Sequence, residues 1–151
     1  MKKIYLYTIM LMALSLVSCS HNHDHDHDYD HEDMIILAAY SDSYEVFVEA
    51  NTFAVNEESN ITVFITSLSN YKPMKEGKVK ATLRVGSYNI EQASGAPIKE
   101  GIYSFSFTPK SIGTAQLTIE IDSEEGINDV IFDDITVFDD EHEAQHAAHD
   151  A

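Results

Sequence analysis

Apolar and polar residues alternate along much of the chain between residues 34 and 138. In the stretch GKVKATLRV, one face of an extended strand would carry Val79, Ala81, Leu83 and Val85. The stretch GTAQLTIEI repeats this pattern with Ala115, Leu117, Ile119 and Ile121. A period of two predicts half-buried β-strands, because an amphipathic helix would need a period of 3.6.

Other segments of the same region are rich in β-branched and aromatic residues, which favour strands. They read MIILAAY, YEVFVEA, ITVFITSL, IYSFSFT and DVIFDDITVF. The stretches NEESN, SNYKPMKEG, ASGAP, PKSIG and DSEEG are typical of turns between them. About seven short strands with no helix among them predict an all-β fold, an immunoglobulin-like antiparallel β-sandwich.

The predicted sandwich carries no evident catalytic chemistry. Residues 34–138 contain neither histidine nor cysteine, so a His-based triad, a thiol nucleophile or a Cys/His metal cage cannot be built there. We therefore expect a protein that is not an enzyme. Asp133 and Asp134 interrupt an apolar strand and are interpreted as a bulge, with a carboxylate pair as the alternative. The acids of DSEEG lack regular calcium-ligand spacing, so a solvated turn is favoured over a calcium loop.

The chain begins with a secretory signal. Residues 1–19 read MKKIYLYTIMLMALSLVSC, a charged start followed by an apolar run too short to span a membrane. The ending Leu-Val-Ser-Cys resembles the lipobox of bacterial lipoproteins, which implies that Cys19 is acylated and becomes the first mature residue. An ordinary signal peptide with a chance cysteine is the alternative. Ser20 after the cysteine implies onward transport to an outer membrane, with the leaflet left open.

Four segments follow from these patterns. They are a signal peptide at 1–18, the lipidated cysteine with a disordered His/Asp-rich arm at 19–33, the sandwich at 34–138, and an acidic tail at 139–151. The formal charge of −17 argues against a nucleic-acid partner, because phosphates need a basic surface. Such acidity instead suits a surface that attracts cations.

All eight histidines lie outside the predicted sandwich. The arm, HNHDHDHDYDHED, alternates imidazoles with carboxylates, an arrangement able to wrap a divalent transition metal. Zn²⁺ or Ni²⁺ is the most expected ion, with Co²⁺ and Cu²⁺ also suited. The candidate ligands in the arm are His21, His23, Asp24, His25, Asp26, His27 and His31. The alternatives are a solvated acidic spacer and an expression tag, which would not stand between a natural signal and the domain.

The tail predicts a short helix. Asp139 or Asp140 can cap it, and spacings of four and three residues then place His142, His146 and His149 on one face as further metal ligands. Arm and tail could share one ion or bind separately. Because the two ends of a seven-strand sandwich often emerge at opposite poles, separate sites are expected.

Several stretches of the sequence together resemble a known family. The residues that match its pattern are Phe47 and Glu49, Val55 and Glu57, Thr66 and Leu68, and Tyr71, Pro73 and Gly77. With GIYSFSFTPKSIGTAQLTIEI and DDITVFDDEHEA, they resemble the leading domain of periplasmic adaptor (membrane fusion) subunits of heavy-metal efflux pumps of the resistance-nodulation-division class. The pattern covers about residues 21 to 143, and a His/Asp/Glu-rich leader often precedes that domain in the family.

The resemblance implies a role beside metal efflux, as a lipid-anchored metal buffer or donor in the cell envelope. The adaptor's coiled-coil hairpin, lipoyl-like domain and β-barrel have no counterpart here, so we do not expect this chain to bridge a pump to a channel. The alternative function, from a different class, is a non-catalytic interaction module that docks on an efflux pump or a neighbouring envelope protein without binding metal.

Overall fold

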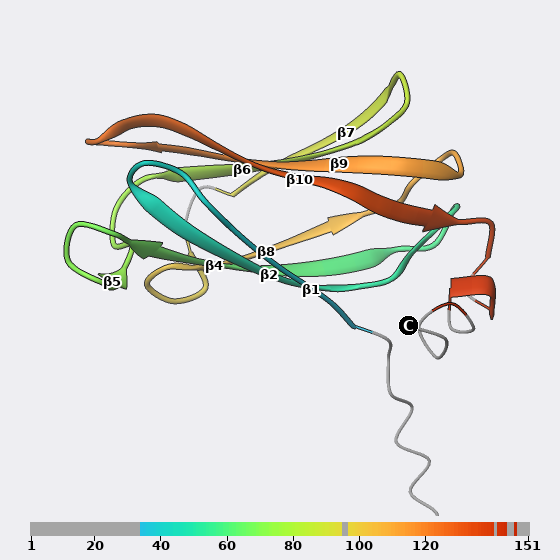
Figure 1. Cartoon of the computed structure of the whole chain (residues 1–151), viewed down its shortest axis with the longest axis horizontal. Coiled ribbons are helices and arrows are strands. Elements are labelled where there is room, and N and C mark those ends of the chain that lie inside the picture. Colours follow the sequence, from blue (N-terminus) through green and yellow to red (C-terminus); the bar gives the residue numbers. More distant parts are fainter. Residues whose placement is uncertain (1–33, 95–96, 141, 145–146, 148–151) are drawn as a thin grey trace, which may run out of the picture. The chain divides into compact units, whose positions relative to one another are not determined.

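The computed structural model describes residues 34–94, 97–140, 142–144 and 147. Its strands form two packed sheets (Figure 1). The first sheet contains β1 (Met34–Tyr40), β2 (Tyr44–Asn51), β4 (Ser59–Ser67), β5 (Lys72–Pro73) and β8 (Ile102–Phe107). The second sheet contains β3 (Phe53–Ala54), β10 (Gly126–Phe138), β9 (Gly113–Ser123), β6 (Lys78–Val85) and β7 (Tyr88–Ser94). All strand pairs among the described residues are antiparallel except that of β3 with β10.

The strand order is that of an immunoglobulin-like sandwich. In the first sheet β4 lies between β2 and β8, and in the second sheet β9 lies between β6 and β10. Neighbours within a sheet are therefore often distant in sequence, and the chain crosses repeatedly from one sheet to the other. The predicted fold class is confirmed. The strands β3, β5 and β7 were not expected from the sequence.

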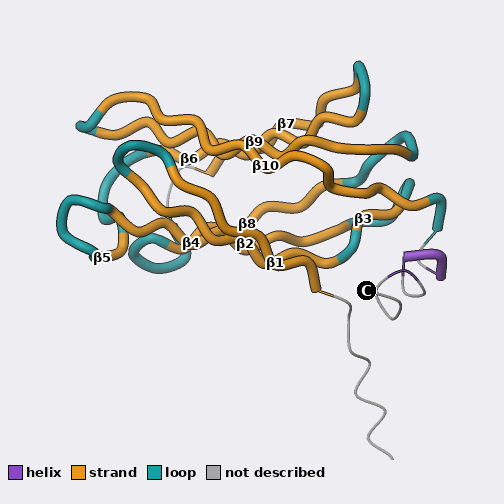
Figure 2. Tube along the Cα trace, in the orientation of Figure 1, coloured by secondary structure: helices purple, strands orange, loops and turns teal. Residues whose placement is uncertain are grey.

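The alternation in β6 and β9 sets the core. Their predicted inward residues stand opposite one another: Val79 with Ile121, Ala81 with Ile119, Leu83 with Leu117, and Val85 with Ala115. All eight side chains are buried. The facing layer comes from β2, β4 and β8 (Figure 2). Buried residues alternate along these three strands in the same way. Burial of these apolar side chains between two sheets is the main favourable contribution to folding.

The interruption of the last strand is a β-bulge. The register of β10 against β9 shifts between Phe132 and Ile135, and Asp134 adopts a φ of 60°. The neighbouring Asp133 Oδ1 accepts a hydrogen bond of 2.7 Å from Gln116 Nε2. The favoured interpretation of this pair is confirmed, because the extra residue lets Val130, Phe132 and Ile135 all face the core.

The acidic stretch DSEEG covers the end of β9, the turn at Glu124 and Glu125, and the first residue of β10. The Ser123 hydroxyl accepts a hydrogen bond of 3.2 Å from the Glu125 backbone N–H, and Asp122, Glu124 and Glu125 are exposed. The prediction of a solvated turn is confirmed. Among the residues that the structure describes, no helix is long and apolar enough to cross a bilayer.

Candidate functional site

The end of β10 fixes where the tail leaves the sandwich. β3 pairs in parallel with β10, Phe53 opposite Val137 and Ala54 opposite Phe138. The Val55 backbone N–H then donates to the Phe138 carbonyl at 3.0 Å. These contacts hold the end of β10 against β3, which lies in the segment that connects β2 with β4. The direction in which the tail starts is therefore well defined.

A helical turn follows immediately. The Asp140 carboxylate accepts a 2.8 Å hydrogen bond from the Glu143 backbone N–H, and the Ala144 N–H donates to the Asp140 carbonyl at 3.2 Å. In return, Glu143 Oε2 accepts a 3.3 Å hydrogen bond from the Asp139 N–H. This arrangement is similar to a capping box, in which side chains satisfy the free N–H groups of a helix start. The predicted cap is confirmed, with Asp140 as the capping residue.

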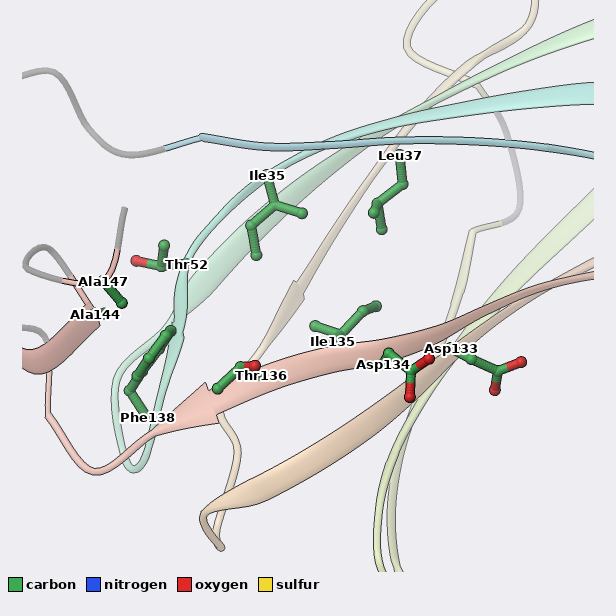
Figure 3. A pocket seen from close by; sticks show the side chains of 10 residues that line it. All are labelled: Ile35, Leu37, Thr52, Asp133, Asp134, Ile135, Thr136, Phe138, Ala144 and Ala147. Atoms are coloured by element: carbon green, nitrogen blue, oxygen red, sulfur yellow. The ribbon is translucent and has the colours of Figure 1, made fainter. Parts of the chain in front are cut away.

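The helical turn packs back on the sandwich through its alanines. Ala144 is fully buried, and with Ala147 it lines a pocket of about 270 Å³ between β1 and β10. The other lining residues are Ile35, Leu37, Thr52, Asp133, Asp134, Ile135, Thr136 and Phe138. Figure 3 shows Ile35 and Leu37 pointing from β1 toward β10, with the alanines beside Phe138 at one end and the two aspartates at the other.

The start of β1 and the start of the tail therefore lie at the same end of the sandwich. Ile35 is the second residue of β1, and Ala144 belongs to the turn after β10, yet both line this one pocket. The expectation that the two ends emerge at opposite poles is wrong. The reason is that β1 runs antiparallel to β2, which brings its start to the end of β2, and that β3, directly after β2, pairs with the end of β10.

The structure describes one of the predicted metal ligands. His142 is exposed in the helical turn, two residues before the buried Ala144. The remaining candidates lie outside the described residues: Cys19, His21, His23, Asp24, His25, Asp26, His27, His31, His146 and His149. Within the described part of the chain, no three His, Cys, Asp or Glu side chains are grouped closely enough to hold a metal ion. The metal ligands thus stay a prediction.

A second surface, which was not predicted from the sequence, crosses the solvent face of the first sheet. Ala38 stands opposite Phe47, Phe47 opposite Phe64, and Phe64 opposite Ile102, so four strands contribute one residue each. The Phe47 and Phe64 rings have centroids 5.7 Å apart and are inclined at 56°. We call these four residues the outer row. The signal in the sequence is a phenylalanine at the outward phase of both YEVFVEA and ITVFITS, where a polar residue is usual.

Comparison with known proteins adds little beyond the fold. No protein-family model matches the chain. No curated protein matches it either. Among solved structures, the chain is similar to the CARDB domain of a protein from Pyrococcus furiosus, crystallised in complex with di-metal ions, with 18% identity and a TM-score of 0.37. The similarity covers 68% of this chain and 100% of that domain. At this level of likeness no ligand or residue role is transferred from one protein to the other.

Proposed function

We propose that this protein is a lipid-anchored envelope protein that binds a divalent transition metal with histidines of its arm and its tail. The observation that carries the proposal is the placement of both ends of the sandwich at one pocket. His31 precedes Met34 by three residues, a length of chain that spans at most about 11 Å. His142 lies two residues before Ala144, which lines that pocket. Imidazoles from both segments are thus able to reach a common ion.

The chemistry of the two segments supports such an ion. Five histidines and six carboxylates occupy residues 21–33, and the tail adds three histidines and further acids. Neutral imidazole with carboxylate suits Zn²⁺, Ni²⁺, Co²⁺ and Cu²⁺. Exposed acids near His142, including Asp139, Asp140 and Glu143, raise the local concentration of cations before any ligand binds.

Calorimetry on residues 20–151 tests metal binding directly. We expect micromolar or tighter binding of Zn²⁺ or Ni²⁺. Deletion of residues 21–33 should remove most sites. Deletion of residues 141–151 should weaken the tightest site while leaving weaker arm sites. If arm and tail share an ion, the two deletions will not be additive, because each one removes ligands from the same site.

Matched variants of the arm distinguish the contribution of its imidazoles to metal affinity from that of its carboxylates. Replacing the five arm histidines with asparagine should abolish tight binding, whereas replacing Asp24, Asp26, Asp28 and Asp30 with asparagine should weaken it only moderately. Both variants keep the length of the arm. If the histidine-free arm binds as tightly as the parent, the arm is a solvated spacer and the proposal fails.

The membrane anchor has a test of its own. If Cys19 is acylated, a Cys19→Ala substitution should move the protein from the membrane fraction to the soluble envelope fraction. Mass spectrometry of the mature N-terminus should find a lipid-modified Cys19 in the parent protein. An unmodified N-terminus would leave an ordinary secreted protein.

Within the envelope, we propose that the protein acts as a metal buffer or donor beside a heavy-metal efflux system. The support is the resemblance of residues 21 to 143 to the leading domain of efflux adaptors, together with the segregated histidines. Gene neighbourhood is the quickest check, because adjacency to pump and metal-sensor genes would favour this role. A strain that lacks the gene should become more sensitive to the ion that the protein binds.

The outer row favours a second candidate function, a module that docks on a pump or a neighbouring envelope protein without metal. Phe47 and Phe64 are partly exposed, whereas the other outward residues of β2 and β4 are polar, and exposed aromatic residues are a feature of docking surfaces. Pull-down from envelope with residues 34–151 and no added metal should then recover a specific partner. A Phe64→Lys variant should lose it, with Thr62→Lys as the control on the same face of the same strand.

A further inference from the structure

The strand β1 forms an outer edge of the first sheet and lacks the usual protection of such edges. Its sequence, MIILAAY, contains no charge and no proline over seven residues. β2 pairs with one side of β1, and no strand within the described residues pairs with the other. Soluble proteins usually guard an edge of this length with charges, proline or a bulge, because the open backbone groups otherwise recruit another strand.

Two other edges of the sandwich carry features that hinder pairing with another chain. The open part of β10 carries Asp129, Asp133 and Asp134 and is bent by the bulge. Beside β8, the chain folds back so that the Ile98 N–H donates to the Ile102 carbonyl and the Ile102 N–H to the Lys99 carbonyl. Among the described edge strands β1 is the longest without a charged residue, so it is the edge best suited to pairing with another chain.

We propose that β1 pairs with β1 of a second copy of this chain, antiparallel and centred on Leu37. The order of side chains along the strand supports this partner, because Ile35 and Ile36 precede Leu37 by the same spacing by which Ala38 and Ala39 follow it. In this register Ile35 stands opposite Ala39 of the other copy, and Ile36 opposite its Ala38. Both isoleucines thus meet an alanine, while Leu37 meets Leu37 and Met34 meets Tyr40 at the ends of the pair, so every opposed pair is uncharged.

Pairing would remove apolar surface on the exposed face of β1 from water. Met34, Ile36 and Tyr40 are 53%, 63% and 64% exposed, an unusual amount of apolar surface for one short strand. Ala38 is the member of the outer row that lies on β1. When two β1 strands pair, Ala38 of each copy meets Ile36 of the other, so the outer rows of the two copies join into one apolar surface. Removal of this surface from water favours the paired state.

Charge does not oppose this arrangement locally, although the whole chain has a formal charge of −17. The nearest acids on the same face, Glu45 and Glu49, lie on β2, one strand away from the edge. In the pair, the two β2 strands would be three strand spacings apart, about 14 Å. That exceeds the screening length of about 8 Å at physiological salt, so repulsion between these acids is weak.

Sedimentation equilibrium of residues 20–151 tests the proposal, because it measures the mass of the species over a range of concentrations. We expect a monomer–dimer equilibrium below about 100 µM. Ile36→Lys places an ammonium group at the centre of the pair and should weaken dimerisation about tenfold or more. Ile127→Lys is the matched control, since Ile127 is 70% exposed on the other sheet, and should dimerise as the parent does. A monomeric parent, or an Ile36→Lys variant that dimerises equally well, would overturn the proposal.

Disulfide trapping tests the register and does not depend on a disruptive variant. Residues 20–151 contain no cysteine. Cβ atoms directly opposite across two strands are close enough for a disulfide, whereas those two residues out of register are not. An equimolar mixture of Ile36→Cys and Ala38→Cys should therefore form more disulfide-linked dimer on mild oxidation than either variant alone. Equal yields from all three samples would overturn the antiparallel pairing.

Hydrogen exchange distinguishes the other possible occupants of the edge. The amides of β1 should become more protected as the concentration of residues 20–151 rises. Protection that is independent of concentration but lost on deletion of residues 21–33 would assign the edge to the chain's own arm. Absence of protection at any concentration would leave the edge to a different protein. Either result would refute self-pairing.

Discussion

Ile35 in the first strand and Ala144 in the turn after the last strand line the same pocket, although almost the whole sandwich separates them in sequence. The relationship arises because β1 runs antiparallel to β2 and because Ala144 is buried against the sandwich. It places the start of the domain, which follows the histidine-rich arm, beside the histidine-containing tail.

Replacing Asp140 with alanine should loosen the helical turn that carries His142. The Asp140 carboxylate caps the Glu143 N–H, and loss of such a cap costs about 1 kcal/mol. Hydrogen exchange at the Ala144 amide should accelerate, while urea unfolding of the sandwich should be nearly unchanged. Asp139→Ala is the control, because it retains the backbone N–H that donates to Glu143. Equal exchange in both variants would contradict the assignment of the cap.

Two substitutions of the bulge residue Asp134 should change the stability of the protein in opposite directions. Its φ of 60° lies in the left-handed region, which disfavours most residues with a side chain. Asp134→Gly should stabilise the protein by up to about 1 kcal/mol, and Asp134→Val should destabilise it by about 1–2 kcal/mol. Urea unfolding measures both. Asp133→Gly should not stabilise the protein, because it loses the hydrogen bond from Gln116.

The Tyr103 hydroxyl provides a test of the core. It is buried without a hydrogen-bond partner in the described structure, so Tyr103→Phe should leave stability unchanged or raise it by up to about 1 kcal/mol. Burial raises the pKa of Tyr103, with a smaller contribution from the nearby Tyr44. Ionisation of Tyr103 is therefore less favourable in the folded state than in the unfolded state. Its contribution to the free energy of unfolding is fully present below the unfolded pKa of about 10 and is lost as pH rises through the folded pKa. Unfolding measured above pH 10 should show a smaller alkaline loss of stability for Tyr103→Phe than for the parent.

Mild acid should release metal without unfolding the protein. A histidine must be neutral to bind a metal, and a free imidazole takes up a proton near pH 6.5, so affinity for Zn²⁺ or Ni²⁺ should fall steeply between about pH 7 and pH 5. The sandwich, residues 34–138, contains no histidine, and its stability should hardly change over that interval. Calorimetry and circular dichroism at matched pH values measure the two quantities. Full occupancy at pH 5 would mean that carboxylates hold the ion, and Ca²⁺ should then compete.

The sequence was sufficient to predict the strands whose two faces differ strongly. β6 and β9 alternate without interruption, and their predicted inward residues are all buried. Even β1, which lacks polar residues, begins and ends where its apolar run does. In contrast, β7 includes a single aliphatic residue longer than alanine, Ile90, and β3 and β5 have two residues each, too few for a periodic pattern.

The geometry of the candidate site was harder to predict, because it depends on pairings between distant segments. A cap at Asp139 or Asp140 was predicted from the sequence because an aspartate before a helical segment is a local signal, and the structure shows that Asp140 is the capping residue. The pocket instead requires the parallel pairing of Phe53 with Val137 and the packing of Ala144, neither of which leaves a local signal. The prediction from the sequence placed the two ends of the sandwich wrongly, and its metal-binding histidines stay a prediction.

The most direct test of the account is a Zn²⁺ titration of residues 20–151 followed by amide and imidazole NMR signals. If arm and tail bind one ion, signals of Met34 and Ile35 should shift together with those of His142 and Ala144 and reach their end points at the same ratio of metal to protein. Signals of core residues such as Leu83 and Ile119 should remain in place. Tail signals that stay unchanged while the arm saturates would contradict a shared site, and an absence of shifts in both segments would contradict metal binding altogether.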